Sequence, residues 1–297
     1  MQDPRDCRYE SLELSVQQDI AHIVLNRPEA LNSMGPAFWQ ELPRVVRAID
    51  HHALARVIVI SSTGKHFSAG MDLAVFAQMG ADFKGEPARR AERMRRSVLE
   101  LQDSFNALED VRIPVLAAVH GGAIGGAVDM LCACDSRYCT EDAFFTIKET
   151  QIGMTADVGT LQRLPHLLPQ GLVRELAYTG RNFGAKEALQ HGFVNQVFAS
   201  QQAMLEGVMA IAGAIAANSP MAVSGCKEML NYSRDHSVSD SLTYMATWQS
   251  GMFQMPDIQE AMAAQQQKRM PEYAPLLNKS SLMSSAAARQ AENKEES

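Results

Sequence analysis

Two buried apolar runs, each ending in a glycine-punctuated loop, most constrain the fold of this chain. The first run is RVIVISS at residues 56–62, and the second is PVLAAVHG at residues 114–121. Short continuous apolar runs bounded by turn residues are typical of strands covered on both faces, as in parallel sheets. Residues 35–52 and the latter part of residues 81–112 have the apolar spacing of amphipathic helices. Strands that alternate with helices predict an α/β fold.

Two further strand signals flank this central pattern. Residues 11–25 alternate apolar and polar positions around a polar QQD turn, which predicts a hairpin. The run AFFTIKE at residues 143–149 predicts another strand, with Glu149 at its end.

The C-terminal third of the chain has a different character. Residues 201–235 and 238–269 are rich in Ala, Met and Gln and have helical patterns with no strand between them. Beyond them the sequence is rich in Ser, Ala, Lys and Glu and has no hydrophobic period, which is typical of a flexible tail. We therefore expect a core with the active site at residues 1–200, a helical region at 201–275 and a flexible tail at 276–297.

Composition and chain ends limit the partners. The chain has 297 residues with 27 basic and 34 acidic side chains, and the net charge of -7 argues against a nucleic-acid partner. The N-terminus MQDPRDCRYE has no apolar segment of a secretory signal, and no apolar run approaches membrane-spanning length. The C-terminus ENKEES does not match a peroxisomal Ser-Lys-Leu ending. These features predict a cytoplasmic protein with no membrane partner.

The cysteines do not form a recognisable framework. There are five of them, an odd number, at positions Cys7, Cys132, Cys134, Cys139 and Cys226. The C-x-C spacing at 132–134 is compatible with metal binding, but no second Cys/His pair with zinc-ligand spacing accompanies it. We expect reduced thiols, small buried hydrophobes at the central positions, and no metal site.

The second buried run leads into GGAIGGAVDM at residues 121–130, where four glycines fall in six positions and Asp129 follows. Glycines before a helix let the backbone approach a ligand closely and expose N–H groups at the helix N-terminus. Such N–H groups favour a phosphate, or a carbonyl oxygen that becomes anionic during a reaction. Neither the Rossmann pattern G-x-G-x-x-G nor the P-loop ending G-K-[ST] is present. This segment alone leaves oxyanion binding and simple close packing of the turn equally open.

A second loop favours oxyanion binding. The segment FSAGMDL at residues 67–73 also follows a buried strand, and it presents backbone at Gly70. Oxyanion holes commonly use two N–H donors from separate segments, and these two glycine loops would supply them.

Four segments together resemble the enoyl-CoA hydratase/isomerase (crotonase) superfamily. They are IVLNRPEALNSM, HFSAGMDL, GGAIGGAVDMLCACDSRYCTEDAFF and KETQIGMTADVGTLQRLP, and the resemblance is strongest over residues 64–165. It implies a crotonase-like spiral of strand-strand-helix repeats, an acyl-CoA substrate and no cofactor beyond coenzyme A. It also implies a homo-hexamer, built as a dimer of trimers, with the C-terminal helices at the trimer contacts.

Three acids make the resemblance more specific. Asp129, Glu149 and Asp157 are similar to the D…E…D set of the dienoyl-CoA isomerases in this superfamily, whereas the hydratases carry glutamates at the first two places. The resemblance implies that 3,5-dienoyl-CoA is isomerised to 2,4-dienoyl-CoA in fatty-acid β-oxidation. It places Glu149 near C2, Asp157 near C6 and Asp129 beside them, with the backbone N–H groups of Met71 and Gly126 on the thioester oxygen.

The chemistry of this reaction fits two carboxylates, because a proton leaves C2 and another is added at C6. Three acids in one apolar pocket do not all ionise cheaply, so we expect a raised pKa and coupled titration. Taken singly, Asp129 would be a local cap or ion-pair partner, Glu149 would face water, and Asp157 would be a helix N-cap.

Two other functions stay open at this point. A 2-enoyl-CoA hydratase would hold an ordered water between Asp129 and Glu149. A non-catalytic acyl-CoA-binding homologue would keep the fold and the oligomer but not the reaction.

Several other residues have weaker signals. The resemblance suggests coenzyme A contacts at Arg27, Lys65, Ala69 and Lys268, the last reaching from a neighbouring subunit. His66 and His120 flank the two loops and are expected to be structural, because the superfamily uses carboxylates. The arginine-rich run at 88–96 is interpreted as a solvated helix face.

Overall fold

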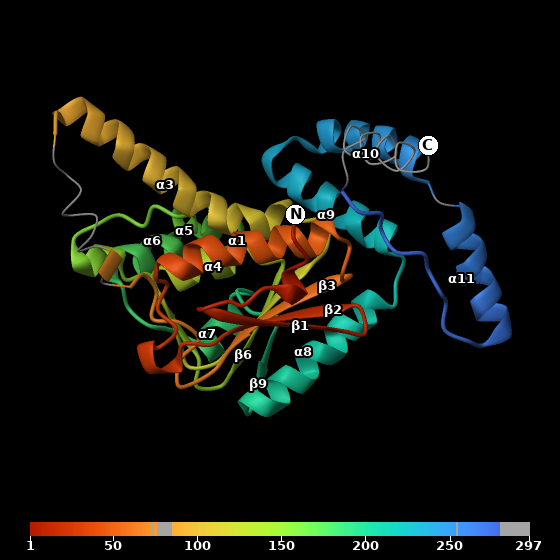
Figure 1. Ribbon diagram of the computed structural model, residues 1–297, viewed down its shortest axis with the longest axis horizontal. Coiled ribbons are helices and arrows are strands. Elements are labelled where there is room, and N and C mark those ends of the chain that lie inside the picture. Colours follow the sequence, from red (N-terminus) through yellow and green to blue (C-terminus); the bar gives the residue numbers. More distant parts are fainter. Residues whose placement is uncertain (73, 76–84, 254, 280–297) are drawn as a thin grey trace, which may run out of the picture.

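The computed structural model describes residues 1–72, 74–75, 85–253 and 255–279, and Figure 1 shows their arrangement. The main sheet has six strands in the order β1-β2-β3-β4-β6-β9. The strands are β1 (Leu12–Gln17), β2 (Ile20–Leu25), β3 (Val57–Ser62), β4 (Val115–Val119), β6 (Ser136–Thr140) and β9 (Gln196–Phe198).

The predicted hairpin is confirmed at one edge of this sheet. β1 and β2 pair antiparallel, and Gln18 and Asp19 between them have φ angles of 50° and 62°. All other neighbouring strands of this sheet pair in parallel. Since parallel neighbours need crossover connections, helices cover the sheet, and the predicted α/β class is confirmed.

A second sheet of three short strands lies outside the first, in the order β5-β7-β8. Its strands are β5 (Gly122–Ile124), β7 (Phe144–Thr146) and β8 (Phe183–Gly184). The prediction that the strand at 143–149 ends at Glu149 is wrong. β7 stops at Thr146 because its partner β5 stops at Ile124, where the chain turns, and Glu149 begins the 3-10 helix η3 (Glu149–Ile152).

The main sheet is buried on both faces, which explains its continuous apolar runs. Along β3, Ile58 and Ile60 belong to the larger core, which includes side chains of α1 (Pro36–His51) and α3 (Pro87–Asp110). The alternate residues Val57 and Val59 pack with α8 (Gln201–Ala216) on the other face. Helix α4 (Gly126–Cys132) follows β5, so a strand-strand-helix unit, β4-β5-α4, leads directly into the site.

The segment between β7 and α8 contains further short helical pieces after η3. They are α5 (Thr160–Arg163), η4 (Leu164–His166), α6 (Gln170–Thr179) and α7 (Ala185–Gln190).

The two C-terminal helical patterns each contain two helices. α8 is followed by α9 (Pro220–Asp235), α10 (Val238–Met252) and α11 (Met255–Gln267). α8 ends before Ser219, whose side chain caps α9, and Pro220 occupies the first turn of α9. α10 and α11 lie beside the body of the molecule rather than on the sheet (Figure 1).

The chain returns to the core after α11. Lys279 donates its N–H to His51 O at 2.8 Å and its ammonium pairs with Asp50 at 2.5 Å. Residues 276–279 of the predicted flexible tail are therefore tied to the end of α1, and residues 280–297 lie outside the described residues.

Within the described ranges, no single helix is long and apolar enough to cross a membrane. One bent pair, α8 with α9 at 105°, passes that test by length and composition only.

Candidate active site

The first loop of the site is held against the second by backbone contacts. Ser68 forms a parallel bridge with Ala123, and Ile124 donates to Ser68 O at 3.1 Å. Gly70 has a φ of 81°, and a Cβ at this position would lie 2.4 Å from Ile124 O. Only glycine allows both the positive φ and this close approach. Gly70 therefore fixes how near Met71 comes to the second loop.

The second loop turns sharply at Gly125 before α4 begins. Gly125 has a φ of 55° and a ψ of -123°, and its N–H donates to Thr146 O at 2.8 Å. Gly126 is the first residue of α4, so its N–H has no acceptor within the helix. The positive end of the helix dipole adds to the attraction for a negative oxygen.

The two predicted oxyanion donors lie close together. Met71 N is 4.0 Å from the position that a Cβ on Gly126 would take. Gly126 N is 3.3 Å from the position that a Cβ on Gly70 would take. Within the described part of the chain, neither Met71 N–H nor Gly126 N–H donates a hydrogen bond. Two convergent backbone donors without an internal acceptor are the arrangement that stabilises a developing oxyanion.

Glu149 lies directly beside this pair of donors. Its Oε1 is 3.0 Å from the position of a Cβ on Gly125, so only a glycine leaves room for the carboxylate. The residue is 8% exposed, and Oε2 is buried with no hydrogen-bond partner among the described residues. Burial, together with the negative charge of Asp129, raises the pKa of Glu149 to about 7. A carboxylate tuned to this range is suited to accept and return a proton near neutral pH.

Asp129 is the most buried of the three acids, with 1% exposure, and it lies within α4. Its Oδ1 accepts the N–H of Thr160 at 2.6 Å, so it caps α5 from 31 residues away. Burial raises the pKa of Asp129 to about 6, and the Thr160 hydrogen bond and the charge of Arg163 oppose that rise.

Asp157 is half-buried in the segment before α5. The N-cap of α5 is Gly159, so the cap role considered for Asp157 taken singly is not what the structure shows. The N–H at the start of α5 donates to Asp129 instead. Its backbone carbonyl accepts Gln102 Nε2 of α3 at 2.7 Å, and burial raises the pKa of the carboxyl.

The structure brings the three acids into one electrostatic unit. The charge of Asp157 raises the pKa values of both Asp129 and Glu149, and that of Asp129 also raises the pKa of Glu149. The pKa values of Asp129 and Glu149 therefore depend on the charges of their neighbours, as expected for carboxyls in a low-dielectric pocket.

Three of the predicted coenzyme A contacts lie near the first loop. Arg27 is half-buried, and its guanidinium is 3.8 Å from Asp72, which directly follows Met71. Ala69 is half-buried and donates its N–H to Leu31 O at 2.9 Å. Lys65 is exposed at the start of the same loop. The sequence suggested Arg27 only as a coenzyme A contact and did not indicate its carboxylate partner Asp72.

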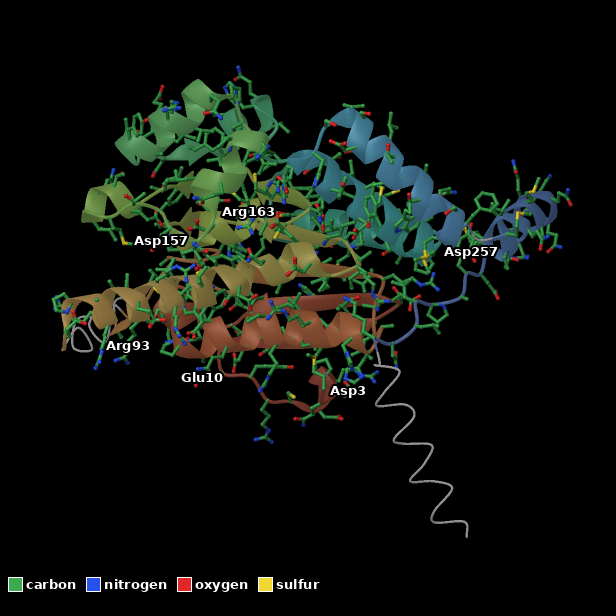
Figure 2. The ribbon with its side chains drawn as sticks, turned by 90° about the horizontal axis from the view of Figure 1, so that it is seen from above. Asp3, Glu10, Arg93, Asp157, Arg163 and Asp257 are labelled. Atoms are coloured by element: carbon green, nitrogen blue, oxygen red, sulfur yellow. The ribbon has the colours of Figure 1, made fainter. Side chains whose placement is uncertain are left out.

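The structure does not bring Lys268 to this site within one chain. It is exposed directly after α11, and Asp257 of α11 lies at the opposite end of the molecule from Asp157 in Figure 2. The fold therefore separates this lysine from the three acids of its own subunit.

Both histidines near the loops bind backbone groups. His66 Nδ1 accepts the N–H of Gly122 at 2.9 Å, and His120 Nε2 lies 2.8 Å from Gly64 O. Burial, with the charge of Lys65, lowers the pKa of His66. These contacts agree with structural roles.

The cysteine and arginine clusters also have structural surroundings. Cys132, Cys134 and Cys139 are buried free thiols, and burial raises the pKa values of Cys134 and Cys139 to about 12. Across the described residues, no group of three or more His, Cys, Asp or Glu side chains is placed to hold a metal ion. The arginines at 89–96 lie on the exposed half of α3, where Arg96 pairs with Glu92.

Thr160 and Arg163, which contact the segments that carry the acids, were not predicted from the sequence. Arg163 Nη2 contacts Asn106 Oδ1 at 2.6 Å and Glu109 Oε2 at 2.7 Å, both on α3. The partners lie more than 50 positions apart in the chain, so no local motif marks them. The only hint was the proximity of Arg163 to Asp157 in the sequence.

The fold and the site together define an acid–base enzyme that acts next to a carbonyl group. The chain belongs to the enoyl-CoA hydratase/isomerase family, whose model matches residues 15–275.

Similar proteins agree with this assignment. The mitochondrial Δ(3,5)-Δ(2,4)-dienoyl-CoA isomerase of Mus musculus is 46% identical over 267 residues, which cover 89% of this chain and 82% of the mouse protein. The peroxisomal enzyme of the same name from Arabidopsis thaliana is 41% identical over 273 residues, covering 90% and 98%. The crystal structure of an enoyl-CoA hydratase from Bacillus anthracis superimposes with a TM-score of 0.80 at 30% identity, covering 89% of this chain and 99% of that one.

Proposed function

We propose that this chain isomerises 3,5-dienoyl-CoA thioesters to 2,4-dienoyl-CoA thioesters in fatty-acid β-oxidation. The observation that carries the proposal is the grouping of Asp129, Glu149 and Asp157 beside the two glycine-positioned N–H groups. Relatives more than 40% identical over most of the chain are named for this reaction. The reaction uses no cofactor beyond the coenzyme A portion of the substrate.

In the first step, Glu149 removes a proton from C2 of the substrate. The thioester carbonyl oxygen accepts hydrogen bonds from Met71 N–H and Gly126 N–H, so the charge that leaves C2 is stabilised as a dienolate. Removing one such donor typically costs about 3 kcal/mol of transition-state stabilisation, so two donors account for much of the barrier reduction.

In the second step, Asp157 gives a proton to C6. The electrons of the dienolate then form the C2–C3 and C4–C5 double bonds, and the C3–C4 and C5–C6 double bonds disappear. One proton has left C2 and one has arrived at C6, so the product has the same composition as the substrate. Glu149 then loses its proton to solvent and Asp157 takes one up, which restores both carboxyls for the next turnover. Asp129 remains beside both acids and raises the proton affinity of Glu149.

The geometry of Asp129 argues against the hydratase alternative. A hydratase needs two carboxylates that share one activated water. Asp129 has a short side chain, is 1% exposed and uses Oδ1 to accept the N–H of Thr160. It is therefore poorly placed to bind and activate a water beside Glu149.

An ultraviolet assay tests the proposal. The purified protein is mixed with a 3,5-dienoyl-CoA, and absorbance of the conjugated 2,4-dienoyl thioester is followed, with Asp157→Asn beside the wild type. A rise that the variant loses supports the isomerase. Consumption of a 2-enoyl-CoA without this rise would instead identify a hydratase, and binding of acyl-CoA without either reaction would identify a non-catalytic homologue.

We also propose that the 201–275 region forms trimer contacts within a hexamer built as a dimer of trimers. The support is a set of exposed apolar side chains on the last three helices, because large exposed apolar patches mark interfaces. The most exposed are Leu230, Val238, Leu242, Phe253, Met255 and Met262. In such an assembly, Lys268 of one subunit would contact the coenzyme A of the next. Light scattering on the purified protein tests the assembly, and a monomer would reject it.

The compartment is a separate proposal. The mouse and Arabidopsis relatives are named as mitochondrial and peroxisomal, so they do not support the cytoplasmic prediction from the chain ends. Fractionation of the source cells with an antibody to this chain would decide it.

A further inference from the structure

A polar stripe on α3 faces the segment that contains Asp157. Gln102, Asn106 and Glu109 are spaced four and three residues apart, so they share one face of the helix. Gln102 binds the Asp157 carbonyl, and Asn106 and Glu109 bind the guanidinium of Arg163. Asp157 and Arg163 lie along the same side of α3 in Figure 2.

Arg163 is packed against the backbone beside Asp157. Gly159 has a φ of 133°, and a Cβ on it would lie 2.0 Å from Arg163 Nη1. The guanidinium thus fills the space next to the glycine, two residues after Asp157 and one residue before Thr160. The arginine side chain is 13% exposed, and its backbone N–H donates to Gly159 O at 2.9 Å.

Glu109 links this segment to the C-terminal helices. Its Oε2 accepts Arg163, and its Oε1 accepts Arg234 Nη1 of α9 at 2.5 Å. Both carboxylate oxygens are therefore used, each by a different arginine. Although burial opposes it, the two arginines keep the pKa of Glu109 below its usual value, so the bridge is ionised at neutral pH.

From these contacts we infer that Arg163 and Glu109 are positioning residues for the proposed isomerisation. The pair clamps residues 157–163 to α3, which sets the place of the Asp157 carboxyl and of the Thr160 N–H that binds Asp129. Arg234 extends the clamp to α9. The inference rests on the function proposed above, and it assigns both residues an action through Asp157 and Asp129 rather than a contact with the substrate.

The inference has a consequence for kinetics. A shift of about 1 Å in a reacting group costs up to about 100-fold in rate, whereas substrate affinity depends on the coenzyme A contacts and the oxyanion donors. Loosening the clamp should therefore lower kcat and leave KM nearly unchanged.

The test compares four variants in the 3,5-dienoyl-CoA assay. Arg163→Met and Glu109→Gln each remove the ion pair, the second without a change of size. Arg163→Lys keeps the positive charge but loses the planar guanidinium that binds both Asn106 and Glu109. The control is Arg47→Met. Arg47 lies in α1 and donates two hydrogen bonds to the Asp103 carboxylate of α3, so this variant removes an ion pair of α3 with α1 instead. Hydrogen exchange of the peptide covering residues 157–166 is measured in parallel.

We expect kcat to fall about 10- to 100-fold in Arg163→Met and Glu109→Gln, with KM within about threefold and faster exchange confined to residues 157–166. Arg163→Lys should recover part of kcat, and Arg47→Met should resemble the wild type. Unchanged kcat in a folded Glu109→Gln protein, or an equal loss in Arg47→Met, would overturn the inference.

The two proposals fail in different ways. If the wild type does not convert the dienoyl-CoA, the proposed function is wrong. Hydrogen exchange of residues 157–166 then tests by itself whether the clamp holds this segment. Faster exchange at 157–166 in Glu109→Gln would then support it, and unchanged exchange would overturn it.

Discussion

The carboxylate of Glu149 lies against the backbone of Gly125, with Oε1 3.0 Å from where a Cβ on that glycine would be. The next residue, Gly126, supplies one of the two proposed oxyanion donors. The proposed base and the proposed donor are therefore fixed to the same turn. In a thioester, C2 is two bonds from the carbonyl oxygen, so an oxygen bound at Gly126 N–H brings C2 within reach of Glu149.

Replacing Gly70 by alanine should abolish most activity. The new Cβ would lie 2.4 Å from Ile124 O at a φ of 81°, so the first loop would have to move away from the second. We expect kcat/KM to fall at least about 100-fold, because one oxyanion donor is lost from its position. The measurement is the dienoyl-CoA assay on the folded variant. Gly171→Ala is the control, because a Cβ on this exposed helical glycine meets nothing within 4 Å; equal activity in the two variants would contradict the prediction.

Asp129→Asn should move the pH dependence of the reaction. Glu149 must be ionised to act as the base, so its pKa of about 7 predicts that kcat/KM falls as the pH drops below about 7. The charge of Asp129 helps to raise that pKa, and asparagine removes the charge while keeping an acceptor for Thr160 N–H. The acidic limb of the profile should therefore shift to lower pH.

The control for this shift is the exposed Asp142→Asn, which removes a negative charge that is not among the causes of the raised pKa values of Glu149 and Asp129. Its profile should match that of the wild type. An acidic limb that stays in place in Asp129→Asn would show that the two carboxyls do not interact as the structure indicates.

Lys227 should be a main anchor between the C-terminal helices and the core. Its ammonium is buried and donates to Leu108 O at 2.8 Å, Ile113 O at 3.0 Å and Asp135 Oδ2 at 2.9 Å. Lys227→Met leaves these acceptors without their donor, and we expect a loss of about 2 to 3 kcal/mol in the free energy of unfolding. Denaturant unfolding at fixed protein concentration measures it. Arg181→Met, which breaks more exposed ion pairs with Glu175 and Glu187, should cost less than about 1 kcal/mol.

The sequence predicted the parts of the site that local patterns determine. A buried strand followed by glycines gave both loops, and Gly70 and Gly125 do adopt positive φ angles. The alternation of strands and helices gave the α/β class. These features depend on neighbouring residues, so one sequence is enough to find them.

The features that the sequence did not predict depend on contacts between residues that are distant in the chain. Taken singly, Asp157 had the pattern of a cap for the following helix, but Asp129 in α4 binds the first N–H of that helix. Glu149 was expected at the end of a strand, but the ladder stops earlier because its partner strand stops. The clamp of Arg163 by Asn106 and Glu109 joins segments that are 57 and 54 residues apart. No periodicity or local motif reports such pairs.

Glu149→Gln should make the protein more stable at alkaline pH while it removes activity. The pKa of Glu149 is raised from 4.5 to about 7 by folding, so the folded state holds the proton more tightly than the unfolded state does. Stability therefore falls as the pH rises from about 4.5 to about 7. Above both pH values, the ionised Glu149 lowers the free energy of unfolding by about 3 kcal/mol. Glutamine is neutral at every pH and does not cause this loss. Urea unfolding at pH 8 should show the variant more stable by about 2 to 3 kcal/mol, and the difference should vanish near pH 4. Wild type and variant that are equally stable at pH 8 would show that Glu149 is not held in the desolvated environment that raises its pKa.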